Sequence, residues 1–134
     1  MRAAILTMAF LACLVLPLRA ADDIATAQAT IRSQAEALGR DDGATAYSYA
    51  APGIQQIFQQ PDMFMAMVRQ NYTPVYRHRR FEFGEARVAD GKVAQKVHIT
   101  DAEGELWEAL YTLEPQPDGS LKIAGCVLAK ATGA

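Results

Sequence analysis

A two-residue alternation of side chains runs through residues 88–113, which read VADGKVAQKVHITDAEGELWEALYTL. One face of the first predicted strand in this stretch carries Val93, Gln95, Val97 and Ile99. One face of the next carries Trp107, Ala109, Tyr111 and Leu113. Alternation of this kind is typical of strands with one buried face. Asp90-Gly91 precedes the first strand and is typical of a tight hairpin turn, because both residues accept a positive φ.

Strands are also predicted on both sides of this stretch, at residues 76–88 and 121–130, the second after the turn residues Pro117-Asp118-Gly119. The N-terminal half has the spacing of a helix instead. Its apolar residues recur every three or four positions, at Ile24, Ala27, Ile31, Ala35 and Leu38. We expect Asp22 or Asp23 to cap the start of this helix and Gly39 to end it in a left-handed turn.

Short helices are expected after the long one, and Pro52 and Pro61 are predicted to open two of them. Ile57 is predicted to face inward, whereas Met65 is predicted to be exposed at a dimer or ligand surface. Three or four helices followed by a four-strand antiparallel meander predict one α+β domain with the helices packed on one sheet face. This order resembles the nuclear-transport-factor-two and ketosteroid-isomerase-like architecture, a resemblance that implies a curved sheet and a cone-shaped apolar pocket.

Residues 1–20 are predicted to be a cleavable secretory signal peptide, followed by a single domain over residues 21–134. Arg2 precedes an uncharged apolar run from Ala3 to Leu16, and Ala20 is a small residue at the expected cleavage position. Alternatives are an uncleaved anchor and acylation of Cys13. The apolar run is shorter than the roughly 20 residues that span a bilayer. We therefore expect export to a periplasm or to the exterior, with no stable membrane anchor after cleavage.

The charge and the cysteine content of the mature chain bear on its partners and on its disulfides. Cleavage leaves 11 basic and 15 acidic side chains, a mildly acidic balance that argues against nucleic acid as a partner. Cys126 is then the one remaining cysteine, so no internal disulfide is expected. We interpret Cys126 as a buried packing residue, with a dimer-forming thiol as the alternative.

The residues themselves resemble an exported bacterial family, the domain of unknown function 4864. The likeness rests on Ala50-Ala51-Pro52-Gly53-Ile54, on the apolar residues around Pro61 to Tyr72, on the turn Asp101-Ala102-Glu103-Gly104 and on the strand Ile123 to Leu128. It extends from about Asp22 to Leu128. The resemblance implies secretion and a small domain. It implies no activity, so no catalytic residue is carried over.

Catalytic and metal-binding patterns are weak in this sequence. No Asp or Glu falls on a predicted core face of the strands, as an isomerase-like base would need to. His78 and His98 have no carboxylate or cysteine at metal-ligand spacing, so neither a metal nor a cofactor is expected. The run Arg77-His78-Arg79-Arg80, with Arg69 before it, has two interpretations: an anion site, or a charged edge strand that blocks aggregation.

These observations favour a non-catalytic domain that binds a small apolar or acidic ligand, or a protein partner. The candidate ligand-binding residues are Tyr47, Tyr72, Arg79, Trp107 and Tyr111. An isomerase-like or cyclase-like enzyme that uses acid–base chemistry in the same pocket is the alternative. A third interpretation is a homodimer with packed sheets, suggested by Leu106 and Leu110 on the outer sheet face.

Overall fold

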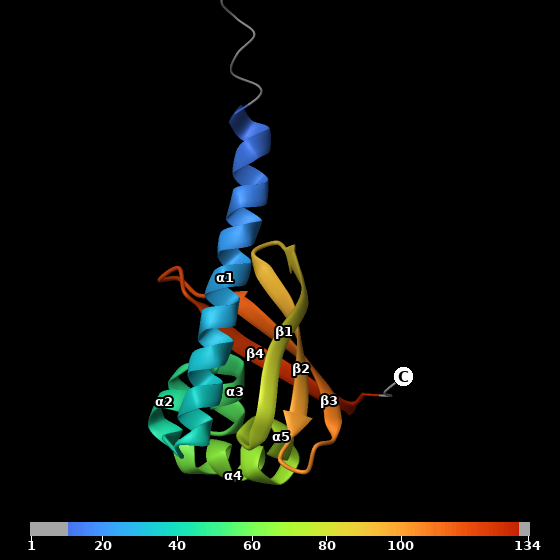
Figure 1. Cartoon of the computed structure of the whole chain (residues 1–134). Helices are drawn as coiled ribbons and strands as arrows, with labels where there is room; N and C mark the ends of the chain where they lie inside the picture. Colours follow the sequence, from blue (N-terminus) through green and yellow to red (C-terminus); the bar gives the residue numbers. More distant parts are fainter. Residues whose placement is uncertain (1–10, 132–134) are drawn as a thin grey trace, which may run out of the picture.

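The computed structural model describes residues 11–131 of the 134-residue chain, so residues 1–10 of the predicted signal peptide lie outside the described part. Within that part, helices come first and strands follow (Figure 1). The helices are α1 (Leu11–Gly39), α2 (Gly43–Ser48), α3 (Pro52–Ile57), α4 (Pro61–Asn71) and α5 (Thr73–Tyr76). The strands are β1 (His78–Ala89), β2 (Lys92–Asp101), β3 (Leu106–Pro115) and β4 (Leu121–Lys130).

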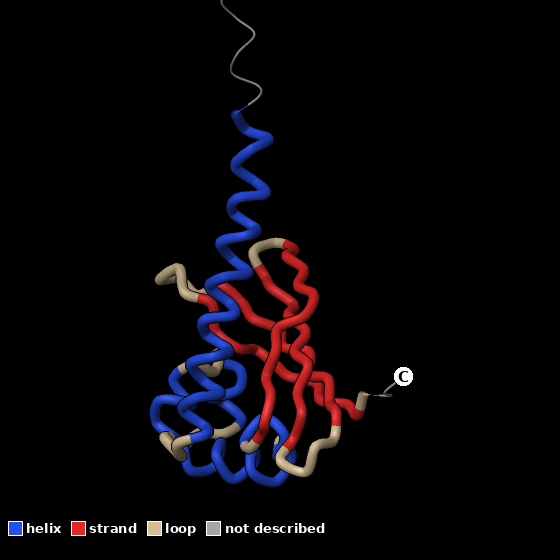
Figure 2. Tube along the Cα trace, in the orientation of Figure 1, coloured by secondary structure: helices blue, strands red, loops and turns tan. Residues whose placement is uncertain are grey.

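The four strands form one antiparallel sheet in the order β1-β2-β3-β4, so each strand pairs with the next along the chain. Figure 2 shows helix α1 crossing this sheet, with the shorter helices gathered at one end. This arrangement confirms the predicted α+β domain. The likeness to a ketosteroid-isomerase-like cone stays a prediction. Asp90 and Gly91 have φ values of 53° and 76°, which confirms the tight turn between β1 and β2.

Helix α1 packs on the sheet through the predicted apolar face, where Ala27 and Ile31 are fully buried and Leu38 is 1% exposed. The predicted ends differ from those observed. The described part of the helix already includes residues upstream of Asp22, so neither Asp22 nor Asp23 caps it. It does end at Gly39, but the left-handed residue is Asp41, with a φ of 58°. Among the helices described, none combines the length and the apolar character needed to cross a membrane.

The short helices follow the expected signals at their starts. Pro52 and Pro61 each occupy the first turn of their helix, where a missing N–H costs nothing, and the Asp42 side chain caps α2 by accepting from the Thr45 N–H at 3.2 Å. The predictions for Ile57 and Met65 were wrong, because Ile57 is 69% exposed and Met65 is 3% exposed.

Close packing of α2 on α4 explains the burial of Met65. A Cβ atom placed on Gly43 would lie 2.9 Å from the Met65 Cγ, so only glycine permits this approach without movement of the methionine. The predicted first strand also starts later than expected, at His78, because Tyr76 belongs to α5.

A buried glutamine side chain forms hydrogen bonds with the main chain at the irregular part of the sheet. The pairing of β1 with β2 shifts register between Phe83 and Ala86, as at a β-bulge, and Gln95 lies there with no exposed surface. Its amide nitrogen donates to the main-chain carbonyls of Gly84 (3.0 Å), Glu85 (3.3 Å) and Lys96 (2.8 Å). Its amide oxygen accepts from the Gln28 Nε2 on α1 at 3.0 Å. Gln95 thus ties the bulge to the helix.

A buried aspartate organises the turn between β2 and β3. The Oδ1 of Asp101 accepts from the main-chain N–H groups of Glu103 (2.9 Å) and Glu105 (2.8 Å), and its Oδ2 accepts from the Trp107 Nε1 at 2.9 Å. These donors lower the pKa of the Asp101 carboxyl below its ordinary value of 3.8, with the indole N–H as the largest cause. The acid at this position is therefore a structural carboxylate.

Candidate functional site

An apolar pocket of about 390 Å³ lies between the short helices and the last two strands. Helices α3, α4 and α5 form one side, β3 and β4 form the other, and the C-terminal half of α1 closes the base. The side chains that give the pocket its apolar surface and its titratable groups are Phe58, Phe64, Met67, Tyr72, Tyr111 and Cys126. A concave, mostly apolar site with a few polar groups is the usual form of a small-molecule site.

Two local features of the sequence build the pocket wall. On α4, Phe64, Met67 and Val68 recur at helical spacing and face the sheet side by side. On β4, the pairing with β3 shifts register between Thr112 and Leu113, which brings Ala124 to the pocket. The wall is thus made by one regular helix face and one irregular strand.

The titratable groups of the pocket are two phenols and a thiol. Tyr72 donates its hydroxyl proton to the main-chain carbonyl of Cys126 at 2.9 Å. Tyr111 faces Cys126 across the β3–β4 pair and is 2% exposed. Burial raises the pKa of Tyr72 and of Tyr111, and it raises the pKa of Cys126 to about 12. All three groups are therefore neutral at physiological pH.

The structure brings only two of the five candidate residues together, because Tyr72 and Tyr111 line this pocket. Tyr47 lies behind the wall: its ring packs edge-on against Phe64 with centroids 5.8 Å apart, and its hydroxyl donates to the Gln55 carbonyl at 3.2 Å. Trp107 lies at the other end of the sheet, held by Asp101.

Arg79 is exposed on β1 and is not among the residues that line the pocket. Sequence reasoning missed Cys126 as a pocket residue, since a lone cysteine in a strand gives no sign of the side from which a helix approaches. The apolar spacing on α4 after Pro61 was the available signal for Phe64 and Met67.

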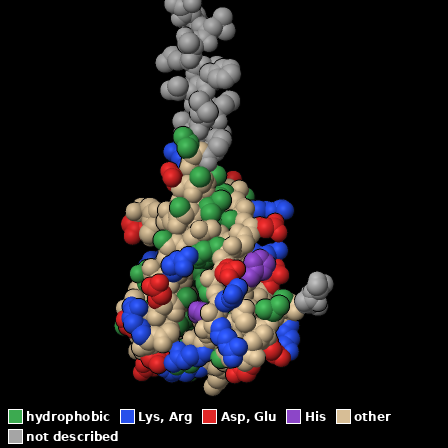
Figure 3. All heavy atoms as spheres, in the orientation of Figure 1, with side chains coloured by type: hydrophobic (Ala, Val, Ile, Leu, Met, Phe, Trp, Pro, Cys, Tyr) green, Lys and Arg blue, Asp and Glu red, His purple; other side chains and the backbone are tan. Residues whose placement is uncertain are grey.

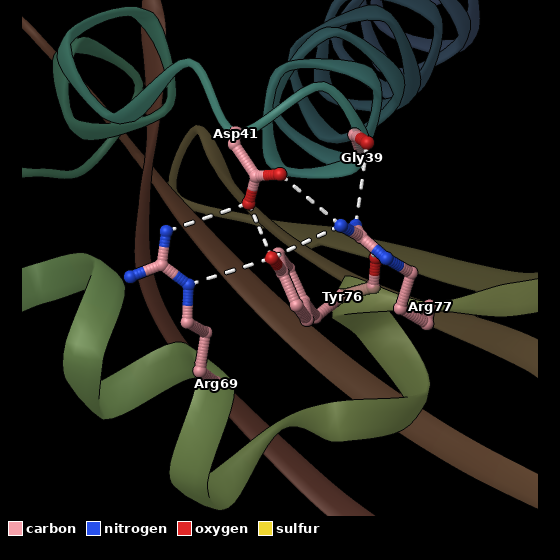
Figure 4. Close-up of polar contacts among 5 residues, drawn as sticks. All are labelled: Gly39, Asp41, Arg69, Tyr76 and Arg77. Atoms are coloured by element: carbon pink, nitrogen blue, oxygen red, sulfur yellow. Dashed lines mark hydrogen bonds and ion pairs between the residues drawn. The ribbon is translucent and has the colours of Figure 1, made fainter.

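The arginines of the basic run at residues 77–80, together with Arg69, lie in two different environments. Arg77 and Arg69 converge on Asp41, at 3.2 and 3.4 Å, and on the ring of Tyr76, which also donates its hydroxyl to Asp41 (Figure 4). Arg77 donates further to the Gly39 carbonyl at 3.2 Å. This cluster joins the end of α1 to α4 and α5.

The positions of Arg79 and Arg80, the remaining arginines of the run, agree with the interpretation of the run as a charged edge strand. β1 forms one edge of the sheet, and Arg80 pairs with Glu82 at 3.5 Å on its exposed surface. Figure 3 shows cationic and anionic side chains mixed over this face of the molecule. A second hollow of about 380 Å³ lies beside the cluster, between α1 and the start of β1, where Arg32 and Glu36 both line it. This hollow therefore carries charges of both signs.

Acid–base and metal chemistry find little support in the apolar pocket. Its lining contains no Asp, Glu, Lys, Arg or His. Asp101 is buried but bound to Trp107 elsewhere, and Asp41 reaches a tyrosine only at an exposed surface. Across residues 18–131, whose side chains the structure describes, no three His, Cys, Asp or Glu side chains gather as metal ligands would.

The chain matches a known protein family. The family described as "Domain of unknown function (DUF4864)" matches residues 20–134, which is most of the chain. No curated protein and no solved structure shows significant similarity to it.

Proposed function

This chain belongs to the DUF4864 family, and we propose that its domain binds a small apolar molecule without transforming it. The observation that carries the proposal is the apolar pocket, whose polar groups are neutral and whose lining has no acid or base. A volume of about 390 Å³ is at the lower end of the range for small-molecule sites, which favours a compact ligand.

A substitution at the pocket wall tests this proposal. Ala124 lines the pocket from β4, and its side chain is exposed. We expect Ala124→Phe to fill part of the cavity and to weaken binding of the neutral fluorescent probe N-phenyl-1-naphthylamine at least about tenfold, the equivalent of roughly 1.4 kcal/mol. The measurement is a fluorescence titration of the purified protein.

Ala129→Phe is the matched control. Ala129 is also exposed on β4 but pairs with Glu108, outside the pocket. Its substitution adds the same ring to the same strand, so the probe should bind as it does to the unmodified protein. Equal binding to both variants, or no saturable binding to the unmodified protein, would contradict the proposal.

We also propose that the domain acts after export, since residues 1–20 have the charge and hydropathy pattern of a signal peptide. The mass of the protein recovered from the exported fraction should then correspond to a chain that begins at residue 21 or 22. An unprocessed or lipid-modified mass would exclude cleavage by this route. A small molecule that is recovered with the protein in native mass spectrometry would identify the ligand class directly.

A further inference from the structure

The Tyr72 phenol of the pocket already donates its proton within the protein. A tyrosine hydroxyl has one donor hydrogen and two acceptor lone pairs. The Tyr72 proton goes to the Cys126 carbonyl at 2.9 Å, whereas the Tyr111 phenol lies across the strand pair from Cys126 and is 2% exposed. What the Tyr72 oxygen can still offer to a ligand is a lone pair, so it acts as an acceptor.

The other polar side chains of the lining, Gln34 and Asn71, are amides, which carry no charge. Gln34 places its Nε2 against the Ala46 carbonyl at 3.2 Å, and Asn71 places its Nδ2 against the Met67 carbonyl at 3.2 Å. No cationic side chain lines the pocket. A carboxylate that entered would lose its hydration without gaining an opposite charge, which is costly in an apolar site.

Tyr72 is the accessible member of the pair. Its side chain is half-buried, whereas Tyr111 is 2% exposed. A ligand hydroxyl beside Tyr72 can donate to the phenol oxygen, and this extends the chain of hydrogen bonds from ligand to tyrosine to the β4 main chain. The rest of the ligand meets Phe58, Phe64 and Met67, which accept apolar surface.

We propose that this pocket selects neutral apolar molecules that carry a hydroxyl group, such as alcohols or phenols, and discriminates against carboxylates. The inference rests on the proposed function, because it names the class of ligand for the same pocket. Of the two ligand classes expected from the sequence, it favours the apolar class over the acidic one.

Three matched probes test this selectivity: 4-propylphenol, 4-propylanisole and 4-propylbenzoate, titrated by calorimetry into the purified protein at neutral pH. One hydrogen bond should give the phenol an affinity about two- to tenfold higher than that of the anisole. The benzoate should bind at least about tenfold more weakly than the phenol, because a buried charge without a partner is costly.

Tyr72→Phe should remove the advantage of the phenol and leave the affinity for the anisole unchanged. Tyr49→Phe is the control, since Tyr49 is outside the pocket lining. An anisole or benzoate that binds as tightly as the phenol to the unmodified protein would overturn the selectivity and leave the proposed pocket intact. If none of the three probes binds, the proposed function itself fails, and the selectivity falls with it.

Discussion

Substitution of Gln95 by leucine should lower the free energy of unfolding by about 2–4 kcal/mol, because it leaves three part-buried main-chain carbonyls without their donor. The side chain is fully buried, and its amide supplies hydrogen bonds to Gly84 and Glu85 at the bulge of β1. Leucine has a similar size but donates nothing. Urea unfolding followed by circular dichroism measures the loss.

Gln28→Leu provides the comparison. It removes one half-buried hydrogen bond, the donation from α1 to the Gln95 amide oxygen, and leaves the carbonyls of the bulge satisfied. Because one acceptor, the amide oxygen of the buried Gln95, loses its donor instead of three, we expect a smaller loss of about 1–2 kcal/mol. If Gln95→Leu costs no more than Gln28→Leu, the bulge does not depend on the glutamine amide.

Asp101→Asn should lower the thermal unfolding midpoint and change the fluorescence of Trp107, the single tryptophan of the chain. The substitution turns one acceptor of the side chain into a donor, which then faces the indole N–H or a main-chain N–H. Because a buried donor without an acceptor is costly, the turn between β2 and β3 should loosen.

The same carboxylate predicts a pH dependence with a definite sign. Its pKa is lowered in the folded state, chiefly by the indole N–H, so its contribution to stability is present above the ordinary value of 3.8. The contribution disappears as the pH falls through the lowered pKa. The difference in stability between the unmodified protein and Asp101→Asn should therefore shrink below about pH 4, and tryptophan emission during an acid titration should follow it.

Asp118→Asn is the control for this effect. Asp118 also accepts hydrogen bonds in a turn, from the N–H and hydroxyl of Ser120, and its pKa is lowered as well. Its residue is exposed, so solvent can replace the lost interactions. If Asp101→Asn and Asp118→Asn had equal thermal unfolding midpoints, the hydrogen bond from Trp107 to Asp101 would stabilise the protein no more than a contact in an exposed turn.

Much of the fold was predictable because local patterns and tertiary packing agree. The alternation around Val97 and Ala109, the turn at Asp90-Gly91 and the apolar face of α1 were all confirmed. The start of α1 was not predictable from a capping residue, since the helix continues upstream of Asp22 through the apolar segment. Met65 was misassigned because its burial depends on Gly43, a partner in another helix.

The candidate site was predictable only in part. Tyr72 and Tyr111 could be chosen as residue types suited to a ligand, but so could Trp107 and Tyr47, which the structure places elsewhere. Tyr72 and Tyr111 line the pocket because it forms where α4 lies against the irregular part of β4. These two segments are far apart in the sequence. Neither hydrophobic period nor turn chemistry carries that information.

The way α1 meets the sheet has a consequence for the newly made chain. Strands of the meander find their partners next to them in sequence, which favours rapid pairing. Helix α1 meets its partners in the sheet much later, because Gln28 bonds to Gln95 and Thr30 bonds to the Leu121 carbonyl. At roughly 5–20 residues per second, synthesis of the intervening chain takes on the order of ten seconds. During that interval the apolar face of α1 has no sheet to cover it, because α1 precedes every strand in the order of synthesis.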